Sequence, residues 1–168
     1  DTIDKIGKSF MGKTGHSNIK KAMKELGIDL AAEVSGHIYF KERYFGFDDA
    51  VYAMMRVLEL VKLGFDLDGE LDKLPRTFST DEIKFNTSEE RKFEIIEAVK
   101  ARIHSGIEEL PAVCDVIEID GIRVRFDDGW ALVRASNTTP VIVTRFEAGS
   151  AEFRDKMQSV FLEILENC

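Results

Sequence analysis

One polar stretch between two apolar runs constrains the fold of this chain more than any other feature. Residues 130–133 and 141–146 are rich in β-branched and apolar side chains, which predicts two β-strands. Between them, residues 134–140 (Arg-Ala-Ser-Asn-Thr-Thr-Pro) offer a guanidinium, three hydroxyls and an amide. Such donors suit a phosphate dianion, because an Arg fork forms charge-assisted bonds and short neutral donors follow the oxygens. Taken alone, the stretch fits equally well a polar hairpin loop that bonds its own backbone.

Local patterns in residues 80–168 predict a small α+β domain. Residues 83–85 indicate a strand, a capping box at residues 87–90 opens one helix, and Ser150 caps the last one. The pair Asp120-Gly121 predicts a two-residue hairpin turn. The inward faces of the two helices are expected to carry Phe93, Ile96, Val99 and Ile103, and Phe153, Met157, Val160, Phe161, Ile164 and Leu165. We therefore expect an antiparallel sheet covered by two helices on one face.

The first half of the chain predicts alternating short helices and strands. A strand over residues 10–13 leads to a helix over 18–26, with Ser17 as N-cap and Gly27 as the left-handed exit. A strand at residues 38–40 follows, and Asp48 or Asp49 caps the next helix. That helix should be well buried, with an apolar stripe made of Val51, Met54, Met55, Leu58 and Val61.

A shift in composition divides the chain. Residues 64–80 are rich in acidic residues, Gly and Pro, which is typical of a connector containing at most a short helix. We expect a domain over residues 1–64, a linker over 65–79 and a second domain over 80–168. The chain begins without Met inside a helical pattern, so we expect a fragment of something longer.

The overall charge limits the partners. A net charge of −8 from 23 basic and 31 acidic side chains argues against generic binding to nucleic acid or anionic membranes. No apolar run approaches the length of a membrane span. The two cysteines, Cys114 and Cys168, have no zinc-site spacing, so a reducing cytoplasm is the expected compartment.

A second polar loop carries the residues that can act on a sugar. In residues 33–37, Glu33, Ser35 and His37 alternate around Gly36, so a tight loop can direct all three toward one ligand. A carboxylate accepts hydrogen bonds from two neighbouring hydroxyls, and a histidine moves protons near neutral pH.

The two loops and the segments between them have the order of one enzyme family. Residues 13–17, 33–37, 41–49, 134–140 and 144–148 together resemble the C-terminal half of the α-D-phosphohexomutases, closest to the bacterial phosphomannomutase/phosphoglucomutase branch. The resemblance covers nearly the whole chain. It implies an α/β and α+β fold: an incomplete α/β third domain followed by a TATA-box-binding-protein-like fourth domain.

The resemblance also implies a reaction. Family members interconvert hexose 1-phosphate and hexose 6-phosphate through a bisphosphorylated sugar that turns end for end. A phosphoserine of the first domain transfers the phosphate, a Mg²⁺ ion held by three aspartates of the second domain assists, and a glucose 1,6-bisphosphate-type activator is implied. The partners are therefore a phosphosugar and the N-terminal domains of the same enzyme.

Roles carry over only onto matching positions. The resemblance implies sugar binding by Glu33 and Ser35, proton transfer by His37 and His16, and phosphate binding by Arg134, Ser136, Asn137 and Thr138. It implies no metal ligand in this chain, which has neither a nucleophile loop of the Thr-Ala-Ser-His-Asn-Pro type nor an Asp-Gly-Asp-x-Asp-Arg loop. We therefore expect the chain alone to be inactive and its incomplete first domain to favour self-association.

Two departures leave the substrate open. Ala32 and Val34 stand where relatives usually have Gly and Met, which weakens any preference for mannose over glucose. One alternative is the C-terminal part of a phosphoglucosamine mutase, although relatives there often carry Gln at the position of Val34. Another is a non-catalytic anion-binding module.

Overall fold

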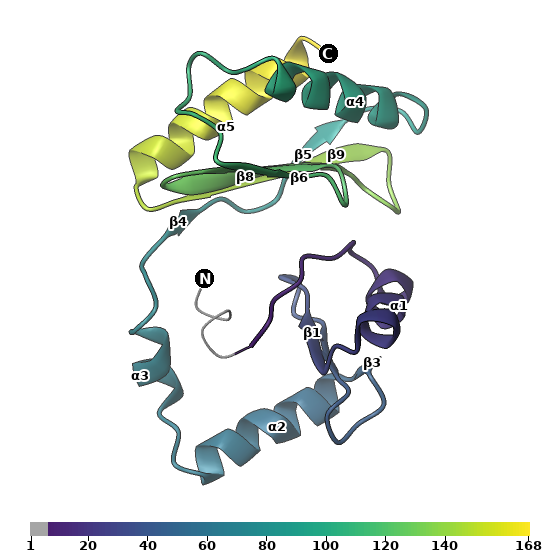
Figure 1. Ribbon diagram of the computed structural model, residues 1–168, viewed down its shortest axis with the longest axis vertical. Helices are drawn as coiled ribbons and strands as arrows, with labels where there is room; N and C mark the ends of the chain where they lie inside the picture. Colours follow the sequence, from purple (N-terminus) through teal and green to yellow (C-terminus); the bar gives the residue numbers. More distant parts are fainter. Residues whose placement is uncertain (1–6) are drawn as a thin grey trace. The chain divides into compact units, whose positions relative to one another are not determined.

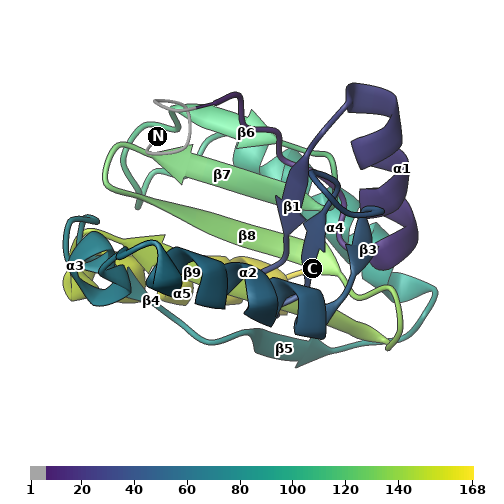
Figure 2. The same ribbon diagram turned by 90° about the horizontal axis from the view of Figure 1, so that it is seen from below.

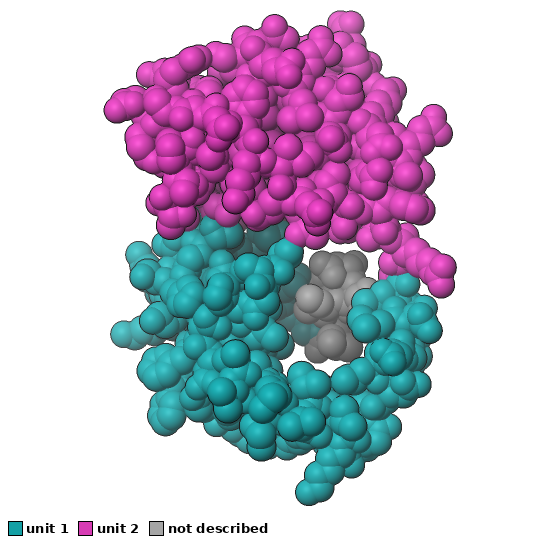
Figure 3. All heavy atoms as spheres, turned by 180° about the vertical axis from the view of Figure 1, so that it is seen from behind, with its two compact units in different colours: residues 1–74 teal, residues 75–168 magenta. Residues whose placement is uncertain are grey.

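In a computed structural model that describes residues 7–168, the chain forms two compact units, residues 1–74 and 75–168 (Figure 3). The division lies inside the segment 65–79, which also contains the short helix α3 (Leu67–Leu71). Each unit has a hydrophobic cluster of its own.

The first unit combines helices with a small antiparallel sheet. Helix α1 (His16–Leu26) is followed by strands β1 (Leu30–Ala32), β2 (Ile38–Phe40) and β3 (Phe47–Asp48), and then by helix α2 (Ala50–Lys62). The strands pair in the order β1-β2-β3, with Ala32 opposite Ile38 and Tyr39 opposite Asp48. Its core is small and consists of Ile19, Met23 and Tyr39.

Two local predictions for the first unit are wrong. Residues 10–13 form no strand, and α1 begins at His16 with Gly15 as N-cap, so Ser17 lies in the first turn and caps nothing. Gly15 has a φ of 102°. The Asn18 side chain donates to the Thr14 carbonyl and so ties the first turn of α1 to the residue before Gly15. The exit prediction is confirmed, since Gly27 has a φ of 67°.

The face of helix α2 that packs against the rest of the unit carries Ala53 and Arg56, and the apolar stripe lies on a different face. Asp49 caps it through the Tyr52 N–H, as expected. Ala53 is its buried residue, and Arg56 on the same face pairs with Glu42 at 2.6 Å. The predicted burial of the stripe is wrong: the fractional exposures lie between 52% and 68% for Val51, Met54, Met55, Leu58 and Val61. Within the described residues of this unit, no element packs over that stripe.

The second unit is an antiparallel sheet with two helices on one face (Figure 1). Its strands are β4 (Phe78–Ser79), β5 (Ile83–Asn86), β6 (Asp115–Ile117), β7 (Ile122–Phe126), β8 (Gly129–Ala135) and β9 (Val141–Ala148). They run in the order β4-β9-β8-β7-β6, with β5 also paired to β9 (Figure 2). The covering helices are α4 (Arg91–His104) and α5 (Ala151–Glu166), which confirms the predicted layers.

Alternation in the strands and helical spacing in the helices build this core. Ile122, Val124 and Phe126 alternate along β7 and are buried, because successive side chains of a strand point to opposite faces. They meet Met157 and Phe161 of α5, whose N-cap Ser150 accepts from the Phe153 N–H as predicted.

Three details of the second unit differ from expectation. Phe93 is 62% exposed and Ile95 takes its place in the core. At the start of α4, the Arg91 N–H donates to the Ser88 hydroxyl. Ser88, and not Thr87 of the predicted capping box, is therefore the capping side chain. The β6–β7 pairing ends at Ile117 opposite Arg123, so the predicted two-residue turn is a longer loop.

Candidate functional site

The loop 33–37 is the tight end of the β1–β2 hairpin. The Glu33 N–H donates to the His37 carbonyl at 2.9 Å, and the Gly36 N–H donates to the Glu33 carbonyl at 2.9 Å. Gly36 has a φ of 91°, a left-handed conformation that favours glycine. Ser35 is therefore held at the exposed tip, between Glu33 and His37, which are both half-buried.

The Glu33 carboxylate connects the hairpin to α1. Its Oε1 accepts from the Gly15 N–H at 3.0 Å, and its Oε2 accepts from the Tyr39 hydroxyl at 3.2 Å. Tyr39 is fully buried, and burial together with the negative charge of Glu33 raises its pKa to about 12. Each carboxylate oxygen keeps a further lone pair, so Glu33 can still accept from ligand hydroxyls.

His16, His37 and Asp48 converge on the same side of this hairpin. His37 Nδ1 lies 2.7 Å from Asp48 Oδ2, and His16 Nε2 lies 3.3 Å from the same oxygen. The ring centroids of His16 and His37 are 5.0 Å apart. The structure thus brings together the two predicted histidines and adds a carboxylate that sequence reasoning treated as a candidate helix cap.

Cross-strand pairing explains the position of Asp48. His37 and Tyr39 are two residues apart on one strand edge and so point to one face of the sheet. Asp48 is the residue opposite Tyr39 in β3, and directly opposed side chains share a face. The sequence feature that could have indicated this role is the pair Asp48-Asp49. Because Asp49 caps α2, Asp48 is available to face the histidines.

The second polar loop joins β8 to β9 and is built around Ser136. The Ser136 N–H donates to the Val141 carbonyl at 2.9 Å. The Ser136 Oγ accepts from the N–H groups of Thr138 and Thr139 at 3.3 and 3.2 Å, and lies 2.9 Å from the Thr139 Oγ1. Ser136 is only 9% exposed, whereas Asn137 and Thr138 are exposed at the tip.

A lysine that sequence reasoning missed supports this loop from α4. Lys92 is 3% exposed, and its Nζ donates to the Ser136 carbonyl at 2.9 Å and pairs with Glu89 at 2.6 Å. The sequence signal was weak, because a single lysine in the first turn of a helix usually faces solvent.

Arg134 precedes the loop on β8 and is largely buried. Its side chain is 16% exposed, and its Nη1 lies 4.0 Å from Asp120 Oδ2. The neighbouring Gly121 has a φ of 74°, and a Cβ there would lie 2.6 Å from the Arg134 Cα. The β6–β7 loop therefore packs closely against the backbone that carries Arg134.

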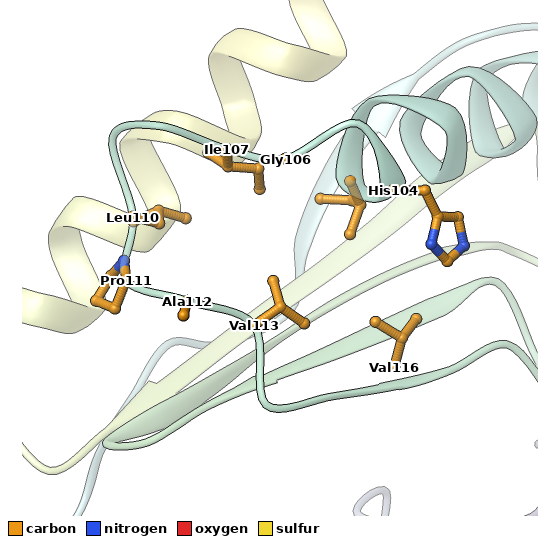
Figure 4. Close-up of a pocket in the computed structure, with 9 residues that line it drawn as sticks. His104, Gly106, Ile107, Leu110, Pro111, Ala112, Val113 and Val116 are labelled. Carbon is orange, nitrogen blue, oxygen red and sulfur yellow. The ribbon is translucent and has the colours of Figure 1, made fainter.

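The second unit also contains a hollow of about 370 Å³ between the end of α4 and residues 106–113. Its wall is mainly apolar, with Leu110, Val113 and Val116 facing the space and the His104 ring at one end (Figure 4). His104 Nε2 is 2.6 Å from Glu118 Oε1. None of the predicted site residues lines this hollow.

Comparison with known proteins identifies the family. Residues 1–78 match the phosphoglucomutase/phosphomannomutase alpha/beta/alpha domain III, and residues 82–163 match the phosphoglucomutase/phosphomannomutase C-terminal domain. The chain belongs to the phosphoglucomutase/phosphomannomutase family.

Individual relatives agree. The chain is 43% identical over 162 residues to a phosphoglucomutase of Neisseria gonorrhoeae, covering 96% of this chain and 34% of that protein. It is 46% identical over 156 residues to a phosphomannomutase/phosphoglucomutase of Pseudomonas aeruginosa, covering 92% and 32%. The chain thus spans about a third of the length of these curated relatives.

A solved structure supports the fold. The crystal structure of a phosphoglucomutase/phosphomannomutase family protein from Burkholderia thailandensis superposes with a TM-score of 0.82 at 38% identity, covering 98% of this chain and 34% of that one.

Among residues 7–168, no helix has both the length and the apolarity needed to cross a membrane.

Proposed function

We propose that this chain is the substrate-binding part of a phosphomannomutase/phosphoglucomutase that interconverts hexose 1-phosphate and hexose 6-phosphate through a bisphosphorylated sugar. The observation that carries the proposal is the grouping of Glu33, His16 and His37 around one short hairpin. A carboxylate with spare lone pairs beside two imidazoles suits a ligand that offers several hydroxyls and a transferable proton.

Glu33 and Ser35 are the proposed sugar-binding residues. Glu33 is held by Gly15 and Tyr39, so its remaining lone pairs have fixed directions. Such a carboxylate accepts from two adjacent equatorial hydroxyls, and a sugar that turns end for end presents a similar pair in either orientation. Ser35, exposed at the tip, adds one adaptable hydroxyl.

His37 is the proposed proton carrier, with His16 beside it. Asp48 contacts His37 at Nδ1, which leaves Nε2 as the nitrogen that can exchange a proton with a sugar hydroxyl. Side-chain exposures of 45% for His37 and 52% for His16 leave both rings accessible to a ligand.

The loop after β8 is the proposed site for the phosphate that does not react. Asn137 and Thr138 lie at its exposed tip and offer an amide and a hydroxyl to a ligand, while the Ser136 hydroxyl shapes the turn through its bonds with Thr138 and Thr139. Arg134 supplies the charge, and its restricted setting on β8 limits the entropy lost on binding. Holding the inert end positions the substrate, and positioning is a large part of phosphoryl-transfer catalysis.

We assign the phosphoserine and the Mg²⁺ ion to segments outside these residues, with which this chain is proposed to act in the cytoplasm. Among residues 7–168, the trio His16, His37 and Asp48 is the set of potential metal ligands within reach of one ion. Mg²⁺ prefers oxygen ligands in octahedral geometry, so two imidazoles and one carboxylate do not fit it. No step of the proposed mechanism therefore passes through a Mg²⁺ ion held here, and we expect this chain alone to be inactive.

A titration followed by nuclear magnetic resonance tests the proposal. Glucose 1-phosphate added to the 168-residue chain should shift backbone signals of residues 33–37 and 134–139, whereas inorganic phosphate should shift only the second set. Glucose without phosphate serves as the control for non-specific effects. Unchanged signals in both loops at millimolar sugar phosphate would refute the assignment.

The amino-sugar alternative has less support. A probable phosphoglucosamine mutase of Methanopyrus kandleri is 27% identical over 171 residues, against 43% and 46% for the relatives above. Comparing turnover of mannose 1-phosphate, glucose 1-phosphate and glucosamine 1-phosphate by the full-length enzyme distinguishes the two.

A further inference from the structure

His16, His37 and Asp48 form a cluster that the proposed function does not fully explain. They come from the start of α1, the end of the β1–β2 hairpin and the end of β3. One ligand atom from each lies within 4.8 Å of the other two. A proton carrier needs one orienting carboxylate, yet here a single oxygen faces two imidazoles at once.

The distances are close to those of a metal centre. Nitrogen and oxygen ligands lie about 2.0 to 2.2 Å from a Zn²⁺ ion, so neighbouring ligands of a tetrahedral site are about 3.3 Å apart. The contacts of Asp48 Oδ2 with His37 Nδ1 and His16 Nε2 are 2.7 and 3.3 Å. All three ligand atoms lie within 4.8 Å of one another, so one ion can be reached from all three side chains.

The three ligands are held by the fold. The Gly15 N–H bonds to Glu33 and fixes the entry to α1 at His16. The His16 ring packs edge-on against the buried Tyr39, with centroids 5.6 Å apart. Asp48 lies opposite Tyr39 in the sheet and is followed by Asp49, whose Oδ2 accepts from the Tyr44 hydroxyl. A site with ligands already in place loses little entropy on binding an ion.

The donor set selects the class of ion. Imidazole nitrogens suit late first-row divalent ions, and Mg²⁺ and Ca²⁺ favour oxygen. Asp48 is 17% exposed, so its charge is poorly screened, while the half-exposed imidazoles leave one side open to solvent. Three protein ligands with one open position are the arrangement in which Zn²⁺ keeps a water or an exchangeable ligand.

We propose that His16, His37 and Asp48 form a binding site for a late first-row divalent ion, Zn²⁺ being the ion the donor set favours, with one coordination position open. This site goes beyond the proposed function. Where that function also holds, an ion bound to His37 through Nδ1 leaves the hydrogen on Nε2, so that nitrogen can no longer accept a proton. Zn²⁺ then inhibits the full-length enzyme independently of its Mg²⁺ site.

Isothermal titration calorimetry on the 168-residue chain tests the site directly. Cys114 and Cys168 are exposed, and thiolates are Zn²⁺ ligands, so both are changed to Ser in every sample. We expect one Zn²⁺ per chain and no heat from MgCl₂ at the same concentration. Asp48→Asn keeps the shape and removes the charge, and should weaken Zn²⁺ binding at least about 100-fold, since loss of even an outer-shell partner costs 10- to 100-fold.

His104→Gln is the matched control. His104 also faces a carboxylate, Glu118, at 2.6 Å, but lies in the second unit, where no third metal ligand joins them among residues 7–168. This variant should bind Zn²⁺ as the parent does. The chain has three histidines, so imidazole resonances provide a second readout: Zn²⁺ should shift those of His16 and His37 and leave those of His104 in place.

Several results would overturn the site: no stoichiometric Zn²⁺ binding, binding unchanged in Asp48→Asn, or binding lost only in His104→Gln. If Asp48→Asn unfolds the first unit, His16→Gln at its exposed position removes one ligand instead and should weaken binding similarly. No sugar is present in these experiments, so the outcome is separate from that of the proposed function. Zn²⁺ binding without any response to glucose 1-phosphate would refute the latter alone.

Discussion

The two polar loops of this protein, residues 33–37 and 134–140, both present hydrogen-bonding groups to a ligand, but they are held in place differently. In the first unit, Glu33 and His37 are oriented by contacts with Gly15 and Asp48, which come from outside the β1–β2 hairpin, and with Tyr39 of β2. In the second unit, Ser136 orients its own loop through the N–H groups of Thr138 and Thr139.

The difference matches the ligands proposed for each loop. A phosphate is nearly symmetric and accepts from donors in many directions, so a short self-supporting turn between two long strands is sufficient to bind it. A sugar presents directional hydroxyls, so its acceptors must be fixed by tertiary contacts. The exception on the phosphate side is Lys92, a tertiary support reaching the loop from α4.

The largest effect is expected from Lys92→Ala. The substitution leaves the Ser136 carbonyl without its charged donor in a buried position and should destabilise the second unit by about 3 kcal/mol. Urea denaturation measures this, with exposed Lys84→Ala as a control of near-zero effect. A cost below about 0.5 kcal/mol would mean that the loop is self-supporting after all.

Arg134→Ala tests whether the loop after β8 binds the phosphate of the substrate. Loss of one charge-assisted phosphate contact is worth about 1.5 to 3 kcal/mol, so the KM of the full-length enzyme for glucose 1-phosphate should rise roughly 10- to 150-fold. Exposed Arg125→Ala, on the neighbouring strand β7, should leave KM near that of the parent. Steady-state kinetics distinguish these cases, and equal KM values would remove Arg134 from the phosphate site.

Glu33→Gln examines the tertiary support of the first loop. The amide keeps one acceptor oxygen but turns an NH₂ group toward either the Gly15 N–H or the Tyr39 hydroxyl, which should cost about 1 to 2 kcal/mol in the first unit. Thermal unfolding monitors the loss. Glu25→Gln on α1, where the pair with Lys21 is solvent-exposed at 3.9 Å, should cost almost nothing.

Ser136→Ala should have the smallest effect on stability. The substitution removes the acceptor of the Thr138 and Thr139 N–H groups, but these lie in an exposed loop where water replaces it, so the cost is about 1 kcal/mol. Ser159→Ala, at an exposed position of α5, provides the comparison. A loss of several kcal/mol, measured in urea, would show that this loop also depends on contacts beyond itself.

The sequence pattern was sufficient to predict those elements whose structure depends on their own residues alone. The strands β7, β8 and β9, the Ser150 cap and the left-handed exit at Gly27 follow from alternation, capping chemistry and glycine conformation. The polar loops could also be located, because their residue types are recognisable between apolar runs. The approach of His16 to His37 depends on how α1 meets the hairpin, and a shared role for the two histidines was expected only through resemblance to a family.

Residues on their own determined where the longer helices and the strands β7, β8 and β9 lie, which loops carry polar donors, and to which family the chain belongs. Only the tertiary structure decided that Asp48 faces both histidines, that Lys92 is buried beneath Ser136, and that the apolar stripe of α2 is exposed. The reason is physical: capping and periodicity act within a few residues, whereas cross-strand register and the covering of a helix face depend on elements far apart in the chain.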